Sequence, residues 1–78
     1  MDKVIITDLA EKDVGRWVIY STDHGTKEIG KIKSWNDKFV FVVYLCEERW
    51  DKFYNYTACA TKAEDLVFTT QEEVLKYE

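Results

Sequence analysis

Residues 29–44 read IGKIKSWNDKFVFVVY, two stretches rich in apolar and β-branched residues on either side of an Asn-Asp pair. Such a pair tolerates the left-handed backbone of a two-residue turn, so the stretch predicts a β-hairpin with Asn36 and Asp37 at its tip. A turn at that position pairs Trp35 with Lys38 and so determines which side chains share a face. We expect the inward face to carry Ile32, Phe39, Phe41 and Val43.

The opposite face of the predicted hairpin is also apolar. It carries Trp35, Val40, Val42 and Tyr44 beside lysine stems, which is too apolar for a face left wholly in water. A cover is therefore expected, and four candidates stay open. These are the C-terminal segment, the N-terminal segment, a partner protein, or a second copy of the chain, which would make a homodimer through this outer hairpin face.

Three further strands complete a mainly β prediction. Strands are expected over residues 15–20, 56–61 and 66–68, the last one directly after a single tight turn at 63–66. With the hairpin they make five short strands, which is typical of a small, strongly bent barrel. We expect one domain over residues 1–78, with the five-stranded barrel at about 14–68 and with Val18 and Leu66 inside it.

The C-terminal residues differ in character from the strands. Thr70 and Glu73 match a capping box, in which two side chains satisfy each other's backbone at the start of a helix. A short α-helix is therefore predicted at about residues 70–77. A helix this short is marginal in water by itself, so it must dock on the barrel. The side chains available for docking are Val74 with Leu75 or Tyr77.

Size and charge narrow the class of protein. The chain has 78 residues and a net charge of −4. A domain of this size buries only about 60–65% of its unfolded surface, so its core is modest. No stretch approaches the roughly 20 apolar residues of a membrane span, and the N-terminus lacks the layout of a signal peptide. We expect a cytoplasmic protein, and the net acidity disfavours a general nucleic-acid binder.

The sequence has few residues and motifs of the kinds that bind metals or catalyse reactions. Cys46, Cys59 and the single histidine, His24, lack the paired spacing of a zinc site, so no metal and no other cofactor is expected. A reducing cytoplasm favours free thiols, but a disulfide between the two cysteines stays open. Because the chain has no Gly-rich phosphate loop, His-Glu metal motif or nucleophile elbow, we expect a protein that is not an enzyme.

The order of these segments resembles SH3-like barrels of the KOW and Tudor type over about residues 14–68. The first strand, the Gly-Lys-Ile arm that begins at Gly30, the all-apolar strand after the turn, and the Asp-Leu pair at residues 65–66 carry this resemblance. It implies a barrel whose last strand follows a one-turn helix.

A second resemblance, to a more restricted group of proteins, rests on the order of residues in particular segments. Residues 29–44, followed by the Trp-Asp pair at Trp50 and by residues 56–61, look like small uncharacterised proteins encoded in phage and prophage genomes. The resemblance implies the cytoplasm of a host cell and brings no particular activity with it.

Aromatic side chains are dense in the charged stretch that follows the hairpin. Trp and Tyr dominate protein-binding hot spots, so we expect an interaction module that binds a host or phage protein through surface aromatics, with Trp50 or Tyr54 substantially exposed. The same rings stay open to two other interpretations, a cage for a cationic side chain and packing at the open barrel end. The expected partner-binding side chains are Trp35, Trp50, Phe53, Tyr54 and Tyr56.

Two alternative functions follow from the uneven distribution of charge. The basic hairpin, with Lys31, Lys33 and Lys38, would make a nucleic-acid-associated module in which Trp35 stacks on a base. The acidic C-terminal part would instead mimic phosphates and inhibit a nucleic-acid enzyme of the host. Its acidic side chains are Glu64, Asp65, Glu72, Glu73 and Glu78.

Overall fold

The computed structural model describes residues 3–21, 25, 27–44, 49–70, 72 and 74. Within these residues, five strands form one antiparallel sheet in the order β4-β3-β2-β1-β5. The strands are β1 (Trp17–Ser21), β2 (Lys27–Trp35), β3 (Val40–Val43), β4 (Cys59–Thr61) and β5 (Leu66–Phe68). The 3-10 segments are η1 (Ile6–Asp8), η2 (Glu11–Asp13), η3 (Trp50–Asn55) and η4 (Ala63–Asp65).

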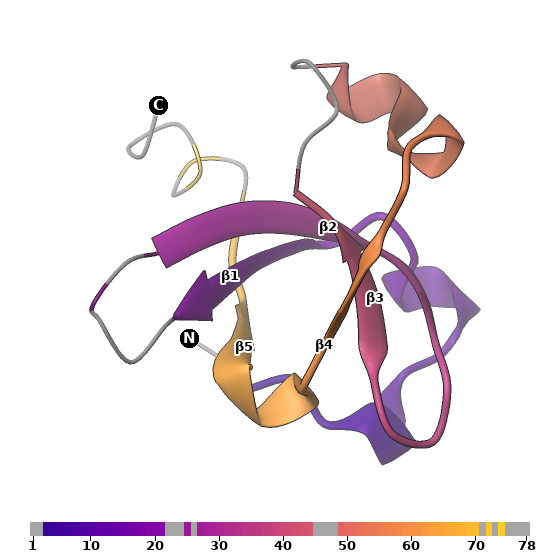
Figure 1. The fold of residues 1–78 in the computed structure, drawn as a ribbon, viewed down its shortest axis with the longest axis vertical. Helices are drawn as coiled ribbons and strands as arrows, with labels where there is room; N and C mark the ends of the chain where they lie inside the picture. The colour runs from indigo at the N-terminus through magenta and orange to yellow at the C-terminus, as the bar shows by residue number, and fades with distance from the viewer. Residues whose placement is uncertain are drawn as a thin grey trace.

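The sheet is strongly curved, and the β2–β3 hairpin tip and η3 lie at opposite ends of the molecule (Figure 1). The mainly β prediction is confirmed, and so are the positions of the predicted strands to within a few residues. Barrel closure is not found, because β4 and β5 stand at the two ends of the strand order and do not pair in the described residues. In that same part of the chain, no helix has the length and apolar character needed to cross a membrane.

The predicted hairpin forms, but its turn lies one residue later than expected. The backbone N–H of Asn36 donates to the Phe39 carbonyl at 2.9 Å, so Asp37 and Lys38 occupy the tip. The Asn36 side chain explains the shift, since its Oδ1 accepts hydrogen bonds from the N–H groups of Lys38 and Phe39 at 2.8 and 2.7 Å. An Asn whose side chain accepts from the N–H groups two and three residues later occupies the first of the four positions of a β-turn.

The structure corrects part of the predicted core. Val40 and Val42, expected on the outer face, are fully buried, whereas Phe39 is 37% exposed and Phe41 is half-buried. Moving the turn by one residue shifts the strand pairing by two positions, so Val40 stays on the face of Trp35 as expected, and the exchange of faces relative to Ile32 has another cause. The other predicted core side chains are confirmed as buried: Val18, Ile32, Val43 and Leu66.

A β-bulge in β2 was not predicted and completes the correction. The register between β2 and β3 shifts between Ile32 and Ser34, so Lys33 is an extra residue on β2. A bulge bends its strand and changes which side chains share a face. As a result Ile32 is buried, and Trp35, three positions later, packs against the same core cluster.

That core cluster lies on the inner face of the sheet and is closed by the N-terminal residues. Lys3 forms an isolated bridge with Val67, and the N–H of Val4 donates to the Leu66 carbonyl at 3.2 Å, so this segment lies along the outer edge of β5. The cluster consists of Val4, Val18, Ile32, Val40, Val42 and Leu66.

The face for which a cover was expected is thus the core face, and Val4 of the N-terminal segment, one of the four candidate covers, packs there. The opposite face of the sheet is covered in part by η3. Trp50 of η3 packs against Trp17 of β1 with ring centroids 4.7 Å apart. The amines of Lys31 and Lys33, on β2, donate to carbonyls at the two ends of this segment, as described below. The cover is therefore supplied at this point by the chain itself.

The C-terminal helix predicted at residues 70–77 falls mostly outside the described residues. The N–H of Val74 donates to the Thr70 carbonyl at 3.1 Å, which is one turn of helical hydrogen bonding, and no longer helix is established. Val74 is only 2% exposed. Its burial agrees with the expectation that this segment docks, while Leu75 and Tyr77 lie outside the described residues.

Candidate functional site

The aromatic segment η3 is held in place by the lysines of β2. The amine of Lys31 donates to the Trp50 carbonyl at 3.3 Å, and the amine of Lys33 donates to the Tyr56 carbonyl at 2.9 Å. The Lys31 amine also lies 4.7 Å from the ring centroid of Trp17 and 5.4 Å from that of Phe53. A cation so placed is attracted by the electron-rich faces of both rings. The cationic side chain that this aromatic cluster holds is therefore the protein's own.

Tyr54 is the exposed member of the predicted aromatic site. It is 58% exposed, which confirms that one of Trp50 and Tyr54 is substantially exposed. Trp50, Phe53 and Tyr56 are half-buried. Trp35 is half-buried too and packs against the core cluster at the hairpin end, away from η3. The structure thus gathers four of the five expected side chains and leaves Trp35 apart from them.

The charged residues on which the two alternative functions depend do not form single surfaces in the described part of the chain. Lys31 and Lys33 are engaged with η3, while Lys38 is exposed at the hairpin tip at the other end of the molecule. On the acidic side, Glu64, Asp65 and Glu72 are exposed. Glu73 and Glu78 lie outside the described residues, as do Cys46 and His24, whereas Cys59 is an exposed free thiol.

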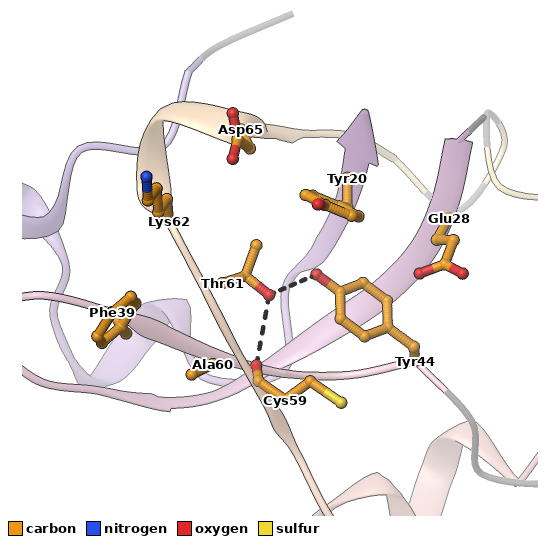
Figure 2. Close-up of a pocket in the computed structure, with 9 residues that line it drawn as sticks. All are labelled: Tyr20, Glu28, Phe39, Tyr44, Cys59, Ala60, Thr61, Lys62 and Asp65. Carbon is orange, nitrogen blue, oxygen red and sulfur yellow. Dashed lines mark hydrogen bonds between the residues drawn. The ribbon is translucent and has the colours of Figure 1, made fainter. Parts of the chain in front are cut away.

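A different site lies where the edge strands β4 and β5 diverge. A cavity of about 490 Å³ opens there, and its walls come from the ends of β1 and β4, the start of β2, the residue after β3, and η4 (Figure 2). The strand register explains the grouping, because Tyr20 pairs with Glu28 on one side and with Leu66, next to Asp65, on the other. The cavity is lined by Tyr20, Glu28, Phe39, Tyr44, Cys59, Ala60, Thr61, Lys62 and Asp65.

Two tyrosine rings form one side of this cavity. The centroids of Tyr20 and Tyr44 are 6.0 Å apart and their planes are inclined by 53°. The Tyr44 hydroxyl shares a 2.8 Å hydrogen bond with the Thr61 hydroxyl, and Thr61 in turn donates to the Cys59 carbonyl at 3.4 Å. These bonds tie the end of β3 to β4 and fix the Tyr44 ring.

The electrostatic character of that side is acidic. Burial raises the pKa of Tyr44 to about 12, the Thr61 hydrogen bond opposes this, and the negative charge of Glu28 adds to it. The phenol is therefore neutral at physiological pH. Figure 2 shows Glu28 beside the two rings and Asp65 above them, with Phe39 and Lys62 at the opposite side of the cavity. A site with two ring faces and two carboxylates attracts a positively charged group.

Reasoning from the sequence missed this site almost entirely. From the sequence, Tyr44 is expected on the outer face of the hairpin and Asp65 in the acidic C-terminal part, and neither Tyr20 nor Glu28 stands out as a site residue. The local sequence gives no signal that the two tyrosines share, since polar residues follow Tyr20 whereas Leu45 and Cys46 follow Tyr44. Which strand ends meet depends on the sheet order, and this order was not predicted.

The described part of the chain holds no group of three or more His, Cys, Asp or Glu side chains that could bind a metal ion. Comparison of the whole chain with protein-family models, with curated proteins and with solved structures finds no match in any of the three.

Proposed function

We propose that this chain is a non-enzymatic protein-interaction module that receives a cationic side chain of its partner, an arginine or a lysine, in the cavity of Figure 2. One observation carries the proposal, namely that a pair of tyrosine rings and two carboxylates line one cavity. Tyr54 and the other aromatics of η3, the interaction surface predicted from the sequence, are a second contact for the same partner.

Size and charge support a side chain as the ligand. A volume of about 490 Å³ accommodates a guanidinium or ammonium group with its alkyl stem. A desolvated cation over a tyrosine ring gains about 0.5–2 kcal/mol, and the carboxylates of Glu28 and Asp65 add charge-assisted hydrogen bonds. Lys62 lines the far side of the cavity, and its positive charge disfavours a cationic ligand on that side.

The fold supports an SH3-like assignment within this proposal. The described chain has the short 3-10 segment η4 directly before β5, as the resemblance implies. Its strands form a meander from β1 to β4, with β5 returning to pair with β1. A phage or prophage origin, with a partner in the host cytoplasm, completes the proposal and rests on the resemblance of the sequence alone.

Selection of ligands from a library of displayed random dodecapeptides tests the function. We expect a class of peptides that share an Arg or Lys and that bind the Glu28→Gln, Asp65→Asn double variant about tenfold or more weakly than wild type. Both carboxylates are exposed, so these substitutions remove charge and preserve the fold. Glu11→Gln, at an exposed position outside the cavity, is the matched control.

The selection also separates this proposal from the nucleic-acid alternative. Peptides without a shared cationic residue, or binding unchanged in the double variant, would contradict the proposed site. Tight DNA or RNA binding that falls steeply with salt and with Lys38→Ala would favour the nucleic-acid module instead.

A further inference from the structure

A second groove lies at the hairpin end of the molecule, between the N-terminal segment, the hairpin tip and the β4–η4 corner. It has a volume of about 560 Å³, and its apolar part comes mainly from Ile5, Phe39 and Ala63. Ile5 is 53% exposed and Phe39 is 37% exposed. Two of the large apolar side chains that this protein exposes thus face one groove, which is the usual mark of an interaction surface rather than of scattered surface residues.

Both walls of this groove are fixed by hydrogen bonds. On one wall, the Ile5 carbonyl accepts from the Asp8 N–H at 3.0 Å, and the neighbouring Val4 is anchored to β5. On the other wall, the Asn36 side chain accepts from the N–H groups of Lys38 and Phe39 and so sets the position of Phe39. A groove between fixed walls loses little conformational entropy when a ligand binds.

The rim of the groove is basic in a chain that is acidic as a whole. Lys3, Lys38 and Lys62 line it against a single carboxylate, that of Glu64, while the whole chain has a net charge of −4. These three lysines are far apart in the sequence and come together only through the fold. Their charge opposes that of the first cavity, where two carboxylates face one lysine.

From this geometry we infer that the groove binds an extended segment of a partner protein in which apolar side chains alternate with Asp or Glu. The apolar side chains of that segment pack on Ile5 and Phe39, and its carboxylates pair with the lysines of the rim. A nucleic acid fits less well, because the groove offers a single aromatic ring for stacking in a molecule with net negative charge.

This inference is independent of the proposed cationic site, although Phe39 and Lys62 line both cavities. A partner that occupies both would present a cationic residue to the first cavity and an acidic, apolar stretch to the groove. Because Ile5 and Lys38 line the groove and are not among the residues that line the first cavity, substitutions at these two positions test it separately.

The library of displayed random dodecapeptides provides the test. We expect a second class of selected peptides, in which Leu, Ile or Phe is flanked by Asp or Glu. Its affinity should fall about tenfold or more on Ile5→Ser and on Lys38→Glu, and should weaken as salt is raised. A peptide of this class with Lys in place of its acidic residues should bind Lys38→Glu better than it binds wild type.

Two controls complete the design. Val14→Ser changes an apolar side chain that is 44% exposed and outside the groove, and it should leave the affinity unchanged. The Glu28→Gln, Asp65→Asn variant should bind the acidic class as wild type does, so failure of one site is distinguished from failure of the other. Absence of an acidic, apolar class, or a class whose binding withstands Ile5→Ser and Lys38→Glu, would overturn the inference.

Discussion

Tyr44 shows how one residue at a strand end joins stability to the candidate site. It directly follows β3, its ring packs at the edge of the core cluster, and its hydroxyl bonds to Thr61 of β4. Burial raises the pKa of the phenol to about 12, so the hydroxyl stays neutral and available for the hydrogen bond. A fixed, neutral ring face beside Glu28 is what the proposed cationic ligand requires.

The raised pKa predicts a loss of stability at alkaline pH. An unfolded tyrosine ionises near pH 10, whereas folded Tyr44 holds its proton to about pH 12, so its contribution is complete below about pH 10 and is lost as the pH rises through 12. In denaturant unfolding between pH 8 and 12, Tyr44→Phe should therefore lose less stability with pH than wild type. At pH 8 it should be about 1 kcal/mol less stable, since the hydrogen bond to Thr61 is gone.

Tyr54→Phe is the matched control for this measurement, because it removes an exposed phenol from another part of the molecule. Parallel pH profiles for wild type and Tyr44→Phe would show that the Tyr44 phenol does not titrate differently in the folded and unfolded states.

At the scale of elements, the hairpin shows what the sequence could predict and where it failed. Both arms and the approximate turn are evident from two stretches rich in apolar and β-branched residues on either side of an Asn-Asp pair. The register depends on which position of the β-turn Asn36 occupies, and on the bulge at Lys33. Neither is visible in the pattern of apolar residues, because β3 reads as apolar at every position.

Two alanine substitutions on the β3 side of the hairpin distinguish the two registers. Val42→Ala should cost about 2 kcal/mol of unfolding free energy, because its side chain is fully buried in the core cluster. Phe39→Ala should cost less, although it removes a larger side chain, since Phe39 is 37% exposed. Denaturant unfolding measures both, and the reverse order would favour the expected register without the bulge at Lys33.

The contacts of segment η3 also show which features the sequence could predict and which it could not. The sequence shows the crowding of aromatic residues in it, but Trp50 packs on Trp17 of β1, and the Lys31 amine lies over the rings of Trp17 and Phe53. A cation–π contact between residues on different strands and segments depends on the sheet register, so it could not be predicted from spacing within η3. Tyr54 remains as the exposed ring.

For the whole molecule, the strands were predictable from sequence and the sites were not. Five strands and the tight turn before β5 follow from local patterns. The first cavity, by contrast, is assembled from side chains that lie up to 45 positions apart, from Tyr20 to Asp65. It exists because β4 and β5 diverge without pairing in the described residues, and the neighbouring groove exists because the N-terminal segment lies along β5. Both depend on how distant segments meet.

The binding of a cation beside Tyr20 and Tyr44 is the central claim, and a titration followed by two-dimensional NMR tests it most directly. The isotopically labelled protein is titrated with N-acetyl-arginine methylamide and, in parallel, with N-acetyl-glutamate methylamide. We expect the arginine compound to shift the amide signals of Tyr20, Glu28, Tyr44 and Thr61, and to do so much less in the Glu28→Gln, Asp65→Asn variant. Shifts centred on Tyr54 and η3, or equal shifts with the glutamate compound, would contradict the account.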